Sequence, residues 1–139
     1  MLKVIKVIKH GEGSRENGLT EWGRKEVERF AQRLSLYDII IAAPSKVTKE
    51  TAEIIAITLG TRLEVTEVLE EISECNKSQT EEKLKKVLEF LWKRKERGIV
   101  IIAPGRLISA LYLHLLGEPI EDKCLDLFNY LKGFEIQII

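Results

Sequence analysis

Short apolar runs recur along the chain, separated by stretches with helical periodicity. Residues 38–44 (DIIIAAP) and 98–104 (GIVIIAP) are apolar over nearly their whole length, which is typical of strands buried on both faces of a parallel sheet. Residues 2–9 (LKVIKVIK) are rich in β-branched side chains and also predict a strand. This alternation predicts an α/β fold, a three-layer α/β/α sandwich whose mainly parallel sheet has helices on both faces.

The first two helices are predicted from their apolar spacing. Residues 19–34 and 46–60 both carry apolar side chains at the i, i+3, i+4, i+7 positions that form one face of a helix. Thr20 is the expected N-cap of the first helix, because its hydroxyl can accept a hydrogen bond from a backbone N–H of the first turn. Gly60 is expected to end the second helix.

Two more helices and three more strands complete the prediction. Ser78 and Glu81 have the spacing of a capping box, which opens a third helix. A fourth helix over residues 105–117 is closed by Gly117. The remaining strands are expected at residues 62–69, 124–130 and 133–139, with the last two paired through a Leu-Lys-Gly turn.

Composition limits the classes of partner. The 139 residues predict a single domain over 1–139, and the hydrophobic fraction of 45% with a charged fraction of 32% is typical of a soluble globular protein. The formal net charge is +0, so no overall field attracts nucleic acid or an anionic membrane. No apolar run approaches the roughly 18 residues of a membrane span. We therefore expect neither nucleic acid nor membrane as a partner.

The two cysteines, Cys75 and Cys124, form no CxxC pair, so a zinc or thioredoxin-type site is not supported. We expect two reduced thiols in a cytoplasmic protein, because the N-terminal residues lack the apolar core of a signal peptide. A disulfide between them stays open at this level. Neither a GxGxxG nor a P-loop motif occurs, and we expect no metal and no cofactor.

The predicted topology brings three strand ends to one rim. Ligands of parallel α/β sheets bind beyond the carboxyl ends of the strands. The three apolar strands end near His10, Ser45 and Arg106. These side chains are therefore expected at one edge of the sheet.

The order of motifs around this rim resembles the histidine phosphatase superfamily, the phosphoglycerate-mutase-like group. The family begins with a strand followed by Arg-His-Gly-Glu, then Leu-Thr-x-x-Gly, then Ser-Pro-x-x-Arg-Ala-x-x-Thr-Ala-Glu, then Leu-x-Glu, and a late strand ending in His-Gly. This chain has KHGE at residues 9–12, LTEWG at 19–23, APSKVTKETAE at 43–53, LEE at 69–71 and PG at 104–105. The resemblance covers most of the chain and implies a phosphoglycerate-mutase-like fold.

The resemblance also implies a phosphatase mechanism. In this family the first-motif histidine attacks phosphorus, two arginines and a second histidine surround the phosphoryl group, and a carboxylate protonates the leaving oxygen. Such a site must meet the charge spread over the phosphoryl oxygens with fixed donors. The attacking imidazole must be neutral at its attacking nitrogen, and a backbone carbonyl usually orients the other nitrogen. By resemblance His10 is the nucleophile and Glu71 fills the place of the acid, although Glu70 and Glu71 are not separable by alignment.

Three matched positions depart from the family pattern. Lys9 replaces the first arginine and keeps the charge without its bidentate fork. Val47 replaces the second arginine, and Pro104 replaces the second histidine, so both groups are lost. Cations that could compensate lie nearby in sequence. Together with Lys9, the candidate phosphate-binding residues are Lys46, Arg106 and Arg15, and the start of the fourth helix offers backbone N–H groups to an anion.

Three hypotheses follow. In the first, the chain is a degenerate member, non-catalytic or very weakly active, that binds a phosphorylated small molecule, a phosphoprotein or inorganic phosphate at the old site. In the second, it is an active phosphatase for phosphohistidine or a small phosphomonoester, with His10 as nucleophile and a rebuilt set of cations. In the third, it is a structural or interaction protein that has lost anion binding as well.

Overall fold

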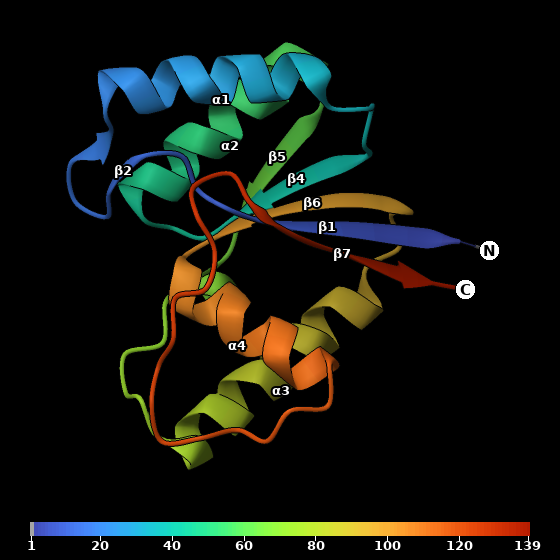
Figure 1. Cartoon of the computed structure of the whole chain (residues 1–139). Coiled ribbons are helices and arrows are strands. Elements are labelled where there is room, and N and C mark those ends of the chain that lie inside the picture. The colour runs from blue at the N-terminus through green and yellow to red at the C-terminus, as the bar shows by residue number, and fades with distance from the viewer. Residues whose placement is uncertain (1) are drawn as a thin grey trace.

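The computed structural model describes residues 2–139, and Figure 1 shows a sheet with helices on both of its sides. Lys3–Lys9 forms β1, and a small hairpin of β2 (Gly13–Ser14) and β3 (Gly18–Leu19) follows it. The remaining elements are α1 (Glu21–Arg33), β4 (Ile39–Ala42), α2 (Lys46–Leu59), β5 (Arg62–Val65), the 3-10 turn η1 (Glu67–Leu69), α3 (Lys77–Lys93), β6 (Gly98–Ala103), α4 (Gly105–Leu115) and β7 (Gly133–Ile138).

The main sheet has the strand order β5-β4-β6-β1-β7. All neighbouring pairs are parallel except β1 with β7. The register places Lys9 opposite Ala103 and Ala42 opposite Ile102, so β1, β6 and β4 end at nearly the same level. The loops that follow these three strands therefore meet at one edge, as the sequence predicts.

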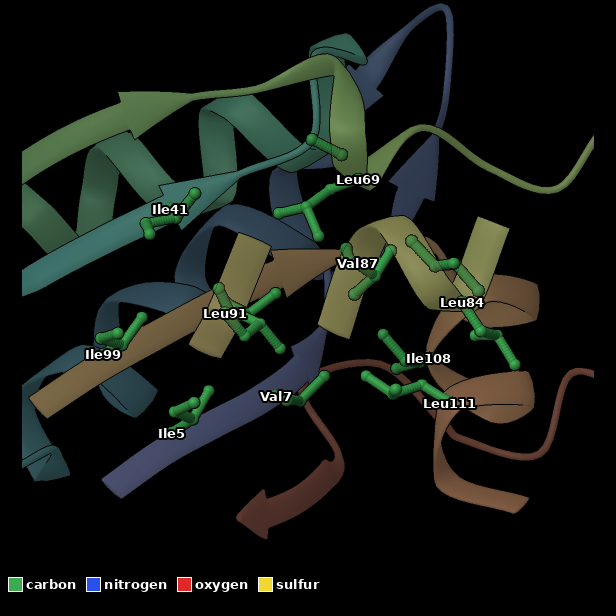
Figure 2. Packing of buried hydrophobic residues seen from close by; sticks show 14 of the residues in the cluster. Ile5, Val7, Ile41, Leu69, Leu84, Val87, Leu91, Ile99, Ile108 and Leu111 are labelled. Atoms are coloured by element: carbon green, nitrogen blue, oxygen red, sulfur yellow. The ribbon is translucent and has the colours of Figure 1, made fainter. Parts of the chain in front are cut away.

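Two apolar layers hold the helices against the sheet, because side chains of successive strand residues point to opposite faces. On one face, Ile8, Ile40 and Ile102 pack with α1 and α2. On the other face, Ile5, Ile41 and Ile101 pack with α3 and α4. Figure 2 shows this second layer, where Leu84, Val87 and Leu91 of α3 and Ile108 and Leu111 of α4 reach the strands. The predicted α/β class with helices on both faces is thus confirmed.

The helix boundaries agree with most of the predicted caps. The Thr20 side chain accepts a hydrogen bond from the Gly23 N–H, and Gly60 ends α2 with a left-handed φ of 64°. The third helix differs from the prediction. Its N-cap is Asn76, whose side chain accepts from the Gln79 N–H, so α3 begins before the expected Ser78–Glu81 capping box.

The C-terminal strand prediction is wrong in its pairing. Residues 124–130 form no strand, and β7 pairs antiparallel with β1 instead of with that segment. The segment 62–69 is also shorter as a strand than predicted, since it ends at Val65 and η1 follows. Both errors have one cause: alternating apolar residues also occur in loops that pack their apolar side chains on a helix or on the sheet. Phe128, for example, stacks edge-on against Tyr112 of α4, with ring centroids 5.3 Å apart.

Candidate functional site

His10 stands at the end of β1, one residue beyond the strand. Its Nδ1–H donates a 2.8 Å hydrogen bond to the carbonyl of Gly11. In a neutral imidazole this leaves Nε2 with its lone pair, which is the state that a nucleophilic histidine needs. Burial lowers the pKa of His10, and the charge of Lys9 adds to this effect, whereas the Gly11 carbonyl and Asp126 oppose it. The half-buried ring is therefore biased toward its neutral form.

Lys9, the predicted substitute for the first arginine, is already paired. Its Nζ lies 3.0 Å from Oδ2 of Asp126 and 5.0 Å from the centroid of the Tyr130 ring. The side chain of Lys9 is only 13% exposed. Its charge therefore faces the segment that follows α4, and it is shared with a carboxylate and an aromatic ring of that segment.

Arg15 and Glu70 form a second pair at the rim. One guanidinium nitrogen of Arg15 lies 3.1 Å and 3.0 Å from the two carboxylate oxygens of Glu70. Arg15 also reaches the neighbouring helix through its backbone, because its carbonyl accepts a hydrogen bond from the Lys46 N–H. The structure brings Arg15 to the start of α2, with its charge balanced by Glu70.

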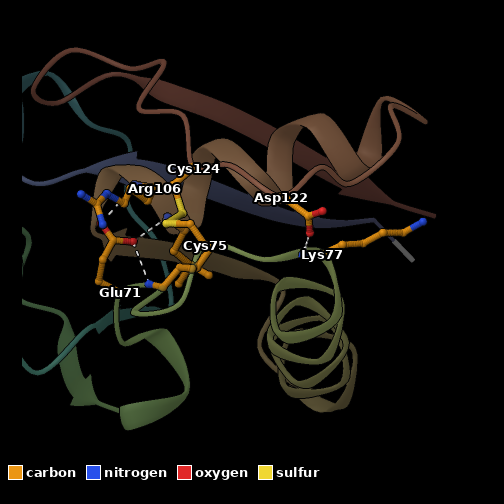
Figure 3. The surroundings of a disulfide bond; sticks show 8 residues. Glu71, Cys75, Lys77, Arg106, Asp122 and Cys124 are labelled. Atoms are coloured by element: carbon orange, nitrogen blue, oxygen red, sulfur yellow. Dashed lines mark hydrogen bonds between the residues drawn. A yellow bond between two sulfur atoms is a disulfide. The ribbon is translucent and has the colours of Figure 1, made fainter.

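Glu71 caps the N-terminus of α4. Its carboxylate accepts hydrogen bonds from the backbone N–H groups of Leu107 at 2.8 Å and Arg106 at 3.1 Å, and also from Ile72 at 3.0 Å (Figure 3). Burial raises the pKa of Glu71, and the three backbone donors oppose this rise. The N–H groups that the sequence predicts as an anion site are therefore occupied by a carboxylate of the chain itself.

The two positions that lack the family residues are buried. Val47 in the first turn of α2 is 1% exposed and belongs to the core. Its carbonyl accepts a hydrogen bond from the Thr51 hydroxyl, which in turn accepts from the Gly11 N–H. Val47 thus lies one helical turn from the residue that contacts the His10 loop. Pro104, which follows β6 next to the end of β1, is buried as well and is the N-cap position of α4 without a side-chain cap.

Lys46 and Arg106 keep exposed side chains, and within residues 2–139 neither takes part in an ion pair. Both stand at a helix start, Lys46 on α2 and Arg106 on α4. The second histidine of the chain, His114, lies near the exposed end of α4, away from His10. The part of the chain described here holds no cluster of three or more metal-ligating side chains.

Sequence reasoning missed Asp126 and Tyr130. Both belong to the segment that was predicted as a strand, and no motif marks them. Tyr130 stacks near His10, with ring centroids 5.9 Å apart, and Leu131 donates its N–H to the carbonyls of Lys9 and His10. Only the tertiary structure brings this segment, more than 100 residues further along the chain, onto the His10 loop.

The cysteines also differ from the expectation of two reduced thiols. Cys75 and Cys124 form a disulfide with an S–S distance of 2.01 Å (Figure 3). It joins the loop after Glu71 to the segment that carries Asp126. Among the described residues, no helix is both long and apolar enough to cross a membrane.

Comparison with known proteins identifies the family of this chain. The model of the histidine phosphatase superfamily (branch 1) matches residues 8–83, which contain the first four motifs of the rim. The chain therefore belongs to the histidine phosphatase superfamily. A search of curated protein sequences finds no match.

Solved structures similar to this chain include phosphatases of low sequence identity. The mycobacterial glucosyl-3-phosphoglycerate phosphatase in its native form is 16% identical, with a TM-score of 0.68 over 99% of this chain and 90% of that one. The phosphoserine phosphatase of Entamoeba histolytica, in complex with 3-phosphoglyceric acid, is 18% identical, with a TM-score of 0.67 over 84% and 81%. The same mycobacterial enzyme in complex with inorganic phosphate is 18% identical, with a TM-score of 0.62 over 86% of this chain and 80% of that one. These likenesses confirm the phosphoglycerate-mutase-like fold.

Proposed function

We propose that this chain has little or no phosphatase turnover and binds a phosphorylated small molecule, a phosphoprotein or inorganic phosphate at the rim around His10. The observation that carries the proposal is the pair of buried apolar residues, Val47 and Pro104, at the positions matched to an arginine and a histidine. A transferring phosphoryl group would meet neither a guanidinium nor an imidazole at these two positions.

The size of this loss favours binding over catalysis. Removing one oxyanion-type donor costs about 2.7–4 kcal/mol of transition-state stabilisation, or roughly 10²–10³ in rate. Two missing groups and the weaker Lys9 lower the rate by several further powers of ten, although such effects are not additive. Binding of an anion needs less, because it requires charge and donors but no stabilisation of a transition state.

The remaining cations support anion binding. Lys9 and Arg15 stand at the rim in ion pairs that are partly open to solvent. Lys46 and Arg106 add two charges at helix starts that form no ion pair within residues 2–139. Exposed ion pairs contribute little to stability, so a phosphate can compete for their cations. Related structures are complexes with phosphate, vanadate and 3-phosphoglyceric acid. The cytoplasmic location expected from the sequence remains part of this proposal.

Two measurements test it together. Hydrolysis of aryl phosphate, sugar phosphate and phosphohistidine substrates should not exceed that of a His10→Ala control. Millimolar phosphate or vanadate should raise the melting temperature, because a ligand that binds only the folded state stabilises it. Turnover far above the control contradicts the first half of the proposal. The absence of any stabilisation contradicts the second half and favours the purely structural hypothesis.

The active-phosphatase hypothesis has one observation in its favour, the Gly11 carbonyl that leaves Nε2 of His10 free to attack. It requires a phosphohistidine intermediate. Acid-labile phosphate that is trapped on the wild-type chain and lost in His10→Ala would support this alternative. A Val47→Arg/Pro104→His variant serves as a positive control. If the missing groups limit turnover, this variant gains phosphatase activity that depends on His10. Circular dichroism checks that it stays folded.

A further inference from the structure

Residues 118–132, which lie between α4 and β7, form a long connection that we call the strap. In Figure 1 it leaves the far end of α4, runs past α3, and returns to the end of β1 before it enters β7. Its last part is fastened to the His10 loop, because Leu131 donates to the carbonyls of Lys9 at 3.0 Å and His10 at 3.3 Å. The Lys9 N–H donates to the Lys132 carbonyl at 2.9 Å. The strap therefore covers the end of β1.

One carboxylate of the strap stands where an anion would bind. Asp126 contacts Lys9 with 3.0 Å between Oδ2 and Nζ, and it also lies against the start of α4. A Cβ atom added to Gly105 would come within 2.2 Å of Oδ1 of Asp126, so the carboxylate packs directly on the backbone after Pro104. Asp126 thus sits between the cation of the first motif and the strand end of the last motif. An incoming phosphate must displace it.

The Asp126 contact is open to competition. The side chain of Asp126 is 45% exposed, and its pair with Lys9 is the only ion pair that it forms among residues 2–139. Water and a dianion can both reach it. The attachment of the strap to the rest of the fold must therefore help to hold the Asp126 carboxylate beside Lys9.

A covalent tether stands two residues before Asp126. Cys124 is joined to Cys75, which lies in the loop between Glu71 and α3 (Figure 3). Noncovalent contacts hold the same half of the strap: the Lys77 N–H donates to Asp122, and the Leu127 N–H donates to the Ser109 hydroxyl. The Glu118 N–H donates to the Leu113 carbonyl, and Ile120 packs against the core. Residues 118–127 contain no helix or strand, and most of them are exposed. The disulfide is the covalent attachment of this half of the strap, and it lies two residues from Asp126.

A reductant can approach this disulfide. Cys75 and Cys124 are both half-buried, and Cys124 lines a cavity of about 230 Å³ that Arg106 borders as well. A dithiol reduces the disulfide by exchange. One of its thiolates attacks a cysteine sulfur, its second thiol resolves the mixed disulfide, and the two protons of the dithiol end on Cys75 and Cys124. The dithiol leaves as a cyclic disulfide, so atoms and electrons balance.

We propose that the strap is a redox-tethered internal competitor for the anion site: Asp126 occupies the place of the anion beside Lys9, the Cys75–Cys124 disulfide holds it there, and reduction by a dithiol opens the site. This inference rests on the proposed function, in that the site is taken to bind phosphate. In a reducing compartment the site would be open, and in an oxidising one it would be closed.

The first test measures phosphate affinity by calorimetry on the full chain, oxidised and after dithiothreitol. Reduction should raise the affinity for inorganic phosphate two- to tenfold, and Asp126→Asn should do the same in the oxidised protein, because it removes the competing charge. Glu121→Gln is the matched control, since it removes a negative charge of the strap whose one ion pair among residues 2–139 is with Lys123. An equal gain in the control overturns the assignment to Asp126.

The second test follows the strap without any ligand. The rate of His10 modification by diethyl pyrocarbonate and the exchange rate of the Leu131 amide should both rise on reduction. If neither rate changes on reduction, the disulfide does not tether the strap, and this conclusion holds whether or not phosphate affinity changes. If both rise but no form binds phosphate, including Asp126→Asn, the proposed function fails while the redox-dependent cover over His10 stands. A Cys75→Ser/Cys124→Ser variant should behave like the reduced protein. If this double variant does not fold, Asp126→Asn still tests the proposal, because it keeps the disulfide.

Discussion

The Oε1 atom of Glu71 accepts a 2.8 Å hydrogen bond from the backbone N–H of Leu107, 36 residues further along the chain. This contact ties the loop after η1 to the start of α4, the helix whose N-cap, Pro104, provides no side-chain acceptor. A carboxylate at this position satisfies free N–H groups and interacts favourably with the positive end of the helix dipole. The residue that by resemblance takes the place of the acid therefore also serves as the cap of α4.

Glu71→Ala should lower the free energy of unfolding by about 1–2 kcal/mol, as for the loss of an N-cap, and Glu71→Gln by less, because an acceptor oxygen remains. Urea unfolding at neutral pH measures both. Glu74→Ala is a suitable control, since Glu74 is exposed in the same loop and forms no ion pair within residues 2–139. Equal stability of Glu71→Ala and wild type would contradict the capping role.

The same carboxyl predicts a pH dependence. Burial raises the pKa of Glu71, so the folded chain holds this proton more tightly than the unfolded chain does. The contribution of Glu71 to stability should therefore fall as the pH rises from the unfolded pKa through the raised folded pKa. Unfolding curves for wild type and Glu71→Gln between pH 4 and pH 7 measure this contribution, as the difference between the two proteins in how the free energy of unfolding changes with pH. A difference that grows with pH in favour of wild type would contradict the prediction.

His10 should titrate below the ordinary histidine range. Burial lowers its pKa, so the contribution of His10 to stability is complete above the unfolded pKa and is lost as the pH falls through the folded pKa. The chain has 2 histidines, which makes the ring signals easy to follow by NMR. The signal that disappears in His10→Gln should have a midpoint below about 6.5. A midpoint above that value would contradict the neutral, partly desolvated ring.

Loss of the disulfide should destabilise the fold. Cys75 and Cys124 are 49 positions apart, and closing a loop of this length in the unfolded chain predicts about 2–4 kcal/mol of stabilisation. Unfolding of wild type with and without dithiothreitol measures this difference, and Cys75→Ser/Cys124→Ser should match the reduced protein and respond no further to dithiothreitol. An additional loss in the double variant on reduction would show that the reductant acts elsewhere.

Gly133 should tolerate no side chain. A Cβ atom there would lie 1.8 Å from the carbonyl oxygen of Val7, in the backbone of the neighbouring strand. Gly133→Ala must push β7 away from β1, so we expect a loss of about 2 kcal/mol or more, the range of overpacked sites. Gly98→Ala is the control, because its Cβ would meet the Tyr37 ring at an ordinary 3.4 Å. Similar melting temperatures for the two variants would contradict this account.

Local patterns were enough to predict the parallel strands of the sheet and most of its helices. Buried apolar runs such as residues 98–104 and helix faces such as that of α1 are encoded by neighbouring residues. The Thr20 side chain and the left-handed backbone of Gly60 likewise cap their helices within one turn. The position of His10 at a strand end followed from the same reasoning, because parallel strands deliver their carboxyl ends to one edge.

The partners of the rim residues were decided only by tertiary structure. Lys9 pairs with Asp126 across 117 residues, and Arg15 pairs with Glu70 across 55. Glu71 binds the start of α4 across 36 residues. No local sequence pattern predicts which group each of these side chains contacts. The pairing of Cys75 with Cys124 and of β7 with β1 has the same origin. Local sequence patterns were sufficient to predict where the ends of the strands meet. Long-range packing decided which charges meet there, because only the folded chain brings the strap and the Glu70–Glu71 loop within hydrogen-bonding distance of that edge.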